Sequence, residues 1–217
     1  MAVEPIGIVR LEALHWYVRD LERSRRFYTQ MMDVPEVATL RPAEVARRGE
    51  TSVLYRAGKA TFICTTPCDP DSRAGRWLRR HPDGVSVLGV RVRDLEATRR
   101  LLEQCPATFV TGIERGEDHL GRPYRWFDIA TPMGDVRFRF VERPPDTLPP
   151  GFAPQDPHGR ANRFGFQVID HVTSNFTTLA PALLWLEHVM GFERYWEVQF
   201  HTTDVSPDRS SGSGLRS

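Results

Sequence analysis

One pattern occurs twice in the sequence, as Leu14-His-Trp-Tyr-Val-Arg-Asp-Leu-Glu22 and as Leu88-Gly-Val-Arg-Val-Arg-Asp-Leu-Glu96. In each copy an apolar run suited to a strand leads into a turn at Arg-Asp, and an amphipathic helix follows. A third, shorter segment, Ile169-Asp-His-Val-Thr173, opens in the same way. Three openings predict three copies of one folding module that begins with a strand and a helix.

The first copy predicts the element order β-α-β-β-β. Asp20 is the expected N-cap of the helix. The inward face of this helix is predicted at helical spacing and comprises Leu21, Ser24, Phe27, Tyr28 and Met31. Two short runs at 51–56 and 61–65, rich in β-branched and aromatic residues, are expected to form a hairpin that turns at Ala57-Gly58-Lys59.

The second copy repeats this order along the chain. It predicts a strand at 85–92, a helix at 94–104 and strands near 108–113, 124–129 and 135–141. We therefore expect an N-terminal domain at 1–143, made of paired modules at 11–67 and 85–143.

A proline-rich segment, from Pro144 to Gly159, is typical of an exposed connector rather than of a helix or a sheet interior. We place a linker at 144–163 and the first part of a further domain at 164–217. That part is expected to contain a strand at 166–172, a helix at 179–190 that Gly191 ends, and a strand at 194–202.

Composition narrows the range of partners. The 217 residues contain 29 Lys and Arg against 28 Asp and Glu, a net charge of +1, so no overall field attracts nucleic acid or an anionic membrane. No apolar run reaches the about 18 residues of a membrane span, and the first residues lack the features of a signal peptide. The three cysteines are expected to be reduced thiols. These features predict a cytoplasmic protein whose partners bind at a local site.

Only His15 and His171, of the seven histidines, lie on the opening strand of a module. The position that corresponds to His15 in the second module is Gly89, which has no side chain to bind a metal. The closing strand at 135–140 offers arginine and phenylalanine where an acidic ligand would be needed. We expect the first domain to be metal-free and His15 to be a core histidine that is hydrogen-bonded to a neighbour.

The sequence resembles the vicinal oxygen chelate superfamily and, within it, the 4-hydroxyphenylpyruvate dioxygenase family. The resemblance covers nearly the whole chain and places the sequence in the N-terminal portion of that family. It implies an α+β fold of glyoxalase/bleomycin-resistance-like βαβββ modules, with one paired N-terminal barrel domain and the start of a second. The stretches that carry it, in the family's order, are Tyr55-Arg-Ala-Gly-Lys59, Thr65-Thr-Pro67, His81-Pro-Asp-Gly-Val85, Gly134-Asp135, Phe140-Val-Glu-Arg143, Ile169-Asp-His171 and Ser213-Gly-Leu-Arg-Ser217.

The resemblance also implies a chemistry. His171 corresponds to the first iron ligand of the family, and Ser217, Leu215 and Thr173 correspond to substrate-pocket positions. The expected cofactor is Fe(II). The expected partners are a small-molecule 2-oxo acid and O2, without nucleic acid or membrane, and homo-oligomer formation stays open. The implied reaction converts 4-hydroxyphenylpyruvate and O2 to homogentisate and CO2 in tyrosine and phenylalanine catabolism. The second histidine and the glutamate ligand are absent from the sequence, so the 217 residues alone are expected to be inactive.

Three alternatives remain open. The chain could be a noncatalytic binding or interaction module of the same fold, or a related oxygenase such as 4-hydroxymandelate synthase. A glyoxalase or an extradiol dioxygenase that uses His15 is a third, and Gly89 argues against it. The sequence also departs from the family at Pro82, where the family has glycine.

Overall fold

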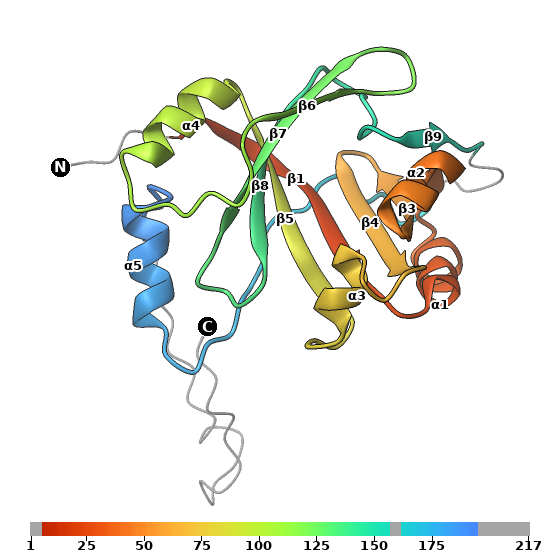
Figure 1. Ribbon diagram of the computed structural model, residues 1–217, viewed down its shortest axis with the longest axis horizontal. Helices are drawn as coiled ribbons and strands as arrows, with labels where there is room; N and C mark the ends of the chain where they lie inside the picture. The colour runs from red at the N-terminus through yellow and green to blue at the C-terminus, as the bar shows by residue number, and fades with distance from the viewer. Residues whose placement is uncertain (1–5, 157–161, 195–217) are drawn as a thin grey trace, which may run out of the picture.

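The computed structural model describes residues 6–156 and 162–194, and its centre is one strongly curled sheet of nine strands (Figure 1). The strand order is β6-β7-β8-β5-β1-β4-β3-β2-β9. The strands are β1 (Ile8–Tyr17), β2 (Glu36–Leu40), β3 (Glu50–Ala57), β4 (Ala60–Pro67), β5 (Gly84–Val92), β6 (Glu114–Glu117), β7 (Pro123–Ala130), β8 (Arg137–Glu142) and β9 (Phe152–Pro154). The helices are α1 (Leu21–Arg26), continued by a π-helical turn (Phe27–Met31), α2 (Pro42–Arg48), α3 (Arg73–Leu78), α4 (Leu95–Glu103) and α5 (Ala180–His188).

Two βαβββ modules form this sheet. In each, the opening strand pairs in parallel with the closing strand, β1 with β4 and β5 with β8. The opening strands β1 and β5 pair antiparallel and join the modules. Leu14 lies opposite Leu88 in this pairing, and these two residues occupy equivalent positions in the repeated sequence, so an approximate two-fold axis passes between them. The predicted fold class is confirmed.

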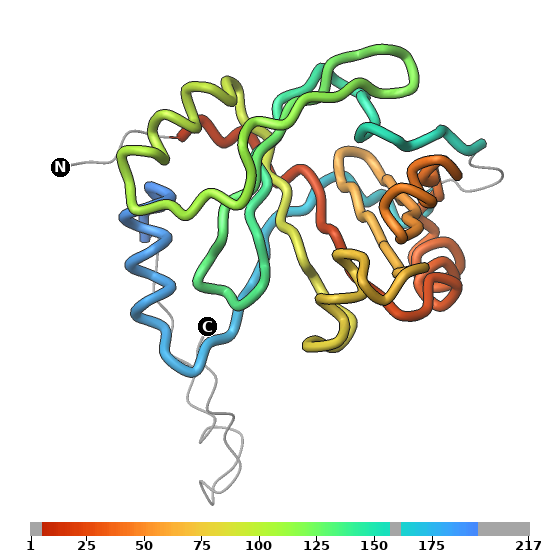
Figure 2. Tube along the Cα trace, in the orientation of Figure 1, coloured from red at the N-terminus to blue at the C-terminus, as the bar shows by residue number. Residues whose placement is uncertain are grey.

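Residues alternate between the two faces of the curled sheet because the side-chain period of a strand is two. On β8, Phe138 and Phe140 are buried in the apolar core between the sheet and the helices α4 and α5, whereas Arg137 and Arg139 point into the concave side. A second core, around Val53 and Cys64, lies on the outer face of the first module. Figure 2 shows α1 and α2 at one end of the sheet and α4 with α5 at the other. The concave side is lined by polar residues together with apolar ones such as Ile63 and Phe152.

The first predicted helix begins as expected and ends differently. The Asp20 side chain accepts a hydrogen bond from the backbone N–H of Arg23, which confirms the N-cap. The predicted inward face is wrong at two positions, since Phe27 is 44% exposed and Met31 68% exposed. A π-helical turn has more residues per turn than an α-helix, so it shifts the inward face. Tyr28 is buried, and Met32 packs against the core in place of Met31.

The expected hairpin is confirmed, because β3 and β4 join through a turn in which Gly58 has a φ of 57°. The strands predicted at 85–92, 124–129 and 135–141 and the helices at 94–104 and 179–190 are also present. The strand predicted near 108–113 is wrong. Only Phe109 forms a bridge, to Ile129, and the paired strand β6 begins at Glu114. The β-like composition at 108–113 therefore did not fix where pairing starts.

The strand predicted at 166–172 is not formed in the described part of the chain, where these residues belong to no strand. A run of strand-forming residues becomes a strand only where a neighbouring backbone pairs with it. One backbone contact is present, from the N–H of Lys59 to the carbonyl of Gln167 at 2.6 Å. The strand predicted at 194–202 lies outside the described residues except for Arg194.

The proline-rich segment packs more closely than an exposed connector would. Leu148 and Phe152 are buried, and β9 extends the sheet by pairing with β2. Pro154 is tolerated there because β9 is an edge strand, which does not need every backbone donor. The domain boundary itself stays a prediction.

The helix α5 of the third predicted module packs on the second module. Val189 and Met190 are buried in the same core as Leu102 of α4. The rings of Trp185 and Phe138 pack edge-on, with 5.6 Å between their centroids. Helix α5 is therefore anchored to the N-terminal sheet by apolar contacts. No helix in residues 6–156 and 162–194 has both the length and the apolar character needed to cross a membrane.

Candidate functional site

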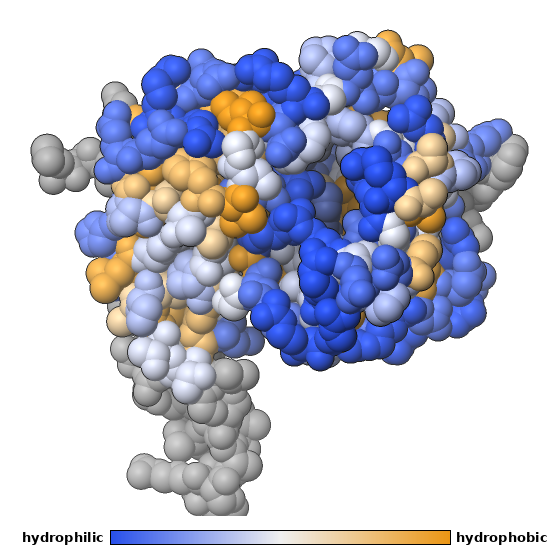
Figure 3. Space-filling view, viewed as in Figure 1, coloured by the Kyte–Doolittle hydropathy of each residue, from blue (hydrophilic) through white to orange (hydrophobic). Residues whose placement is uncertain are grey.

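A cavity of about 130 Å³ lies on the concave side of the sheet, where the two modules face each other. Hydrophilic residues surround the hollow between the two halves of the sheet in Figure 3. Both modules and the proline-rich segment contribute to its wall. The lining residues are His15, Tyr17, Arg48, Glu50, Ser52, Ile63, Thr65, Arg73, Val87, Tyr124, Trp126, Arg137, Arg139, Pro149, Pro150 and Phe152.

Two arginines in this wall are held by one buried carboxylate. Asp128 on β7 is fully buried and lies opposite Arg139 on β8. Its carboxylate accepts two hydrogen bonds from Arg139, at 2.7 and 2.9 Å, and one from Arg137 at 2.7 Å. Burial alone would raise the pKa of Asp128, but the two guanidinium groups hold it below its usual value. Asp128 therefore stays charged and fixes both arginines in place.

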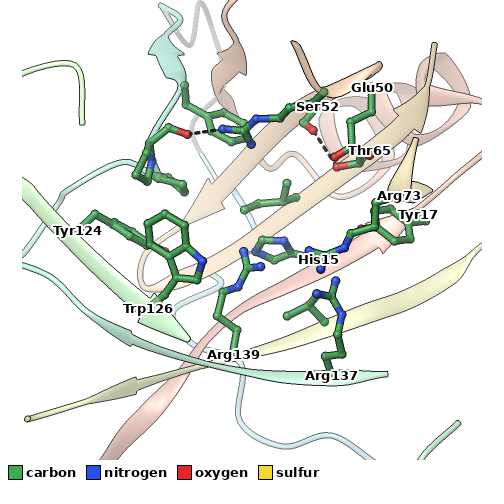
Figure 4. Close-up of a pocket in the computed structure, with 16 residues that line it drawn as sticks. His15, Tyr17, Glu50, Ser52, Thr65, Arg73, Tyr124, Trp126, Arg137 and Arg139 are labelled. Atoms are coloured by element: carbon green, nitrogen blue, oxygen red, sulfur yellow. Dashed lines mark hydrogen bonds between the residues drawn. The ribbon is translucent and has the colours of Figure 1, made fainter. Parts of the chain in front are cut away.

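His15 lies at the centre of the cavity, and Arg139 and Arg73 reach toward it from β8 and α3 (Figure 4). Burial, reinforced by the positive charge of Arg139, lowers the pKa of His15 from 6.5 to about 3, and Asp128 opposes this effect only in part. His15 is therefore neutral at pH 7. The expectation that its side chain is hydrogen-bonded to a neighbour is wrong within the described residues, since the bond from Ser86 Oγ, at 3.3 Å, goes to the backbone carbonyl of His15.

The remaining charged groups of the wall differ in how they are paired. Arg48 donates to Glu44 at 2.8 Å and to the carbonyl of Pro150 at 3.2 Å. Glu50 accepts a hydrogen bond from the backbone N–H of Ala74, in the first turn of α3, at 3.1 Å. Arg73 has neither a hydrogen bond nor an ion pair from its side chain to any residue in 6–156 or 162–194. Among the described residues, the guanidinium of Arg73 is therefore a positive charge of the cavity wall without a hydrogen-bonded or ion-paired partner.

This arrangement offers hydrogen-bond donors rather than metal ligands. Four arginines face the cavity and Glu50 is the one carboxylate in its wall. In the described portion of the chain, no three His, Cys, Asp or Glu side chains gather in a group that could hold a metal ion. Guanidinium groups bind oxyanions through paired N–H donors, so the cavity suits an anion.

The neutral state of the half-buried His15 predicts a specific dependence of stability on pH. The unfolded chain takes up a proton on His15 below about pH 6.5, whereas the folded protein does so only near its lowered pKa of about 3. The free energy of unfolding should therefore fall as the pH falls, by about 2 kcal/mol between pH 7 and pH 5 from this residue. Urea denaturation at several pH values measures it.

The control compares two histidine variants. His15→Gln should flatten this pH dependence, whereas His188→Gln, which changes an exposed histidine at the end of α5, should keep it. An unchanged slope in His15→Gln would show that His15 is not the group responsible.

The predicted iron ligand lies away from this cavity wall. His171 is exposed, with 74% of its side chain accessible, and its Nδ1 is 2.8 Å from Oδ2 of Asp170. Thr173 lies two residues further along and is also exposed. The other two predicted site residues, Leu215 and Ser217, lie outside the described residues. These assignments stay predictions.

Sequence reasoning did not identify the arginine cavity. A signal was present in the alternating segment Arg137-Phe-Arg-Phe140, which places both arginines on one face of a strand. The partners Asp128 and Arg73 come from other elements, and only the curled sheet brings them to the same space.

Sequence comparison with curated proteins gives matches that all carry the same enzyme name. The chain is 29% identical over 173 residues to 4-hydroxyphenylpyruvate dioxygenase from Caenorhabditis briggsae. It is 27% identical over 184 residues to the enzyme of the same name from Dictyostelium discoideum, and 30% identical over 183 residues to that from Hordeum vulgare. These matches cover 73 to 76% of this chain and 39 to 47% of the relatives. No family model matches the chain.

Solved structures share the architecture. A mutant of 4-hydroxymandelate synthase from Streptomyces coelicolor aligns with a TM-score of 0.72 and 18% identity, over 88% of this chain and 55% of that protein. The chain is a relative of 4-hydroxyphenylpyruvate dioxygenases with the vicinal oxygen chelate fold. Methylmalonyl-CoA epimerase from Mycobacterium tuberculosis aligns with a TM-score of 0.51 and 22% identity, over 67% of this chain and 94% of that protein. Proteins with different activities thus share the vicinal oxygen chelate fold of this chain, so the fold alone does not assign a reaction.

Proposed function

We propose that this chain is part of a non-haem iron(II) dioxygenase that converts 4-hydroxyphenylpyruvate and O2 to homogentisate and CO2. The observation that carries the proposal is the similarity of about three quarters of the chain to 4-hydroxyphenylpyruvate dioxygenases from several organisms. The chain spans less than half the length of these relatives, so the activity concerns the protein to which the chain contributes.

Iron would require more ligands than the described residues supply. A facial iron(II) site needs two histidines and one carboxylate. His171 is a suitable donor, because the Asp170 carboxylate bonded to Nδ1 leaves Nε2 free for a metal. No second and third ligand accompany it in residues 6–156 and 162–194, so this part of the chain does not fit iron by itself. We assign no reaction step to it.

The role that we infer for the described residues is structural support of the catalytic half. The N-terminal sheet forms a complete pair of modules, and α5 is anchored on it through Val189 and Met190. Residues 162–179 run from this sheet to α5 and carry Asp170 and His171. The N-terminal sheet would therefore fix both ends of the segment that presents the first iron ligand.

Oxygen uptake with 4-hydroxyphenylpyruvate tests the proposal. We expect no uptake above background from the 217 residues alone with iron(II), and iron-dependent uptake from the protein encoded by the complete reading frame. Uptake by the 217 residues alone would contradict the inference that further ligands are needed. No uptake by either protein, both folded and loaded with iron, would contradict the substrate.

The second candidate is a synthase that forms 4-hydroxymandelate. The structural match to 4-hydroxymandelate synthase, with a TM-score of 0.72, favours it as an alternative. Analysis of the product, rather than of oxygen uptake, separates the two.

A further inference from the structure

We propose that the concave cavity of the N-terminal sheet is a second binding site, for a small carboxylate or phosphate anion. The site lies between β1, β4, β8 and α3, and none of its residues belongs to the segment that carries His171. It is therefore independent of the iron chemistry proposed above.

The charges of the wall favour an anion. Arg137 and Arg139 share the single carboxylate of Asp128, and the guanidinium of Arg73 has no polar partner from residues 6–156 or 162–194. The carboxylate of Glu50 is already bonded to the backbone N–H of Ala74. An oxyanion placed among Arg73, Arg137 and Arg139 would accept hydrogen bonds from the guanidinium N–H groups that face the cavity.

The cavity is also prepared for such a ligand. The side chains of Arg137 and Arg139 are only 13% and 19% exposed, and Asp128 holds both, so little side-chain freedom is lost when a ligand binds. His15 is neutral and can donate or accept one hydrogen bond. Arg73 is exposed on the first turn of α3, so it can close over a ligand that enters from solvent.

The size of the cavity limits the ligand. An engineered cavity of about 150 Å³ holds one benzene molecule. The cavity here measures about 130 Å³, so it fits a phosphate ion or a short dicarboxylate. Trp126 and Tyr124 belong to the apolar part of the wall, against which a short carbon chain could pack.

Titration calorimetry tests the site with three probes, inorganic phosphate, succinate and acetate, at constant ionic strength in chloride. The complete 217-residue chain is used, and the arginine Nε–H signals in NMR spectra report where each probe binds. We expect a dissociation constant of about 1 mM or lower for phosphate or succinate. Tighter binding of phosphate would point to a phosphate-bearing metabolite and tighter binding of succinate to a dicarboxylate.

Arg73, in the first turn of α3, and Arg79, the residue that follows α3, give a matched pair of variants. Arg73→Ala should weaken binding by about 10-fold to 100-fold, because one charged hydrogen-bond donor is lost. Arg79→Ala changes an arginine at the end of the same helix that does not line the cavity, and should alter binding by less than about 2-fold. Arg73→Lys keeps the charge but loses the paired donors, and should lie between the two.

Two results would overturn the proposal. The first is the absence of binding by every probe up to 10 mM above the chloride background. The second is an equal loss of affinity in Arg73→Ala and Arg79→Ala, which would indicate general attraction to the surface of α3. If Arg73→Ala does not fold, Arg73→Lys provides the same comparison with Arg79→Ala.

Discussion

Replacement of Asp128 by asparagine should lower the free energy of unfolding by about 3 kcal/mol. Asp128 is fully buried and is the carboxylate to which both Arg137 and Arg139 are bonded. Asparagine keeps one acceptor oxygen but removes the charge and turns an N–H₂ group toward a guanidinium. Two cations with low exposure would then lack their counter-charge, which costs more than the loss of one hydrogen bond. Urea denaturation at pH 7 measures the change.

An exposed ion pair provides the matched control for Asp128→Asn. Asp71 pairs with Arg79 at 3.3 Å, and its side chain is 82% exposed. Asp71→Asn should change stability by less than about 1 kcal/mol, since solvent screens such a pair. Equal effects in the two variants would show that Asp128 does not organise the cavity. Added phosphate should recover part of the stability of Asp128→Asn if the cavity binds anions, because a bound ligand stabilises the folded state.

His171→Ala should abolish iron-dependent turnover in the protein encoded by the complete reading frame, with a loss of iron(II) affinity of more than about 100-fold. This estimate is a lower bound, because even partners that only orient a metal ligand contribute about 10-fold to 100-fold. Asp170→Asn should produce an effect of that smaller size, since Asp170 accepts a hydrogen bond from Nδ1 of His171 in the appropriate tautomer. Anaerobic iron(II) titration measures the affinity, and oxygen uptake measures turnover.

His188→Ala is the control for His171→Ala. His188 is an exposed histidine in the last turn of α5, in the same part of the chain, and is not expected to bind iron. Iron affinity and turnover should stay at the level of the unsubstituted protein. Retained iron binding in His171→Ala would exclude His171 as a ligand and leave the fold assignment unaffected.

Local sequence signals predicted the modules well. Asp20 caps its helix as expected, and Gly58 takes the positive φ that the hairpin turn requires. These features depend on neighbours in sequence, so the pattern alone determines them. In the register of β1 on β5, equivalent positions of the repeat, Leu14 and Leu88, lie opposite each other, which only the structure shows.

Features that depend on distant residues were predicted less well. The π-helical turn that buries Tyr28 and exposes Met31 has no clear signal in the helical spacing. Pairing decides whether 166–172 is a strand, and composition does not report pairing. Among the site residues, Arg73, Asp128 and Arg139 are far apart in sequence, and the curvature of the sheet brings them together. His171 was selected by resemblance, and its role as an iron ligand stays a prediction.

Identification of the product tests the central proposal most directly. The protein encoded by the complete reading frame is loaded with iron(II), supplied with 4-hydroxyphenylpyruvate in air, and the products are separated and identified. The proposal predicts homogentisate and CO2 in amounts equal to the O2 consumed. Formation of 4-hydroxymandelate, or no product from a folded and iron-loaded protein, would contradict it.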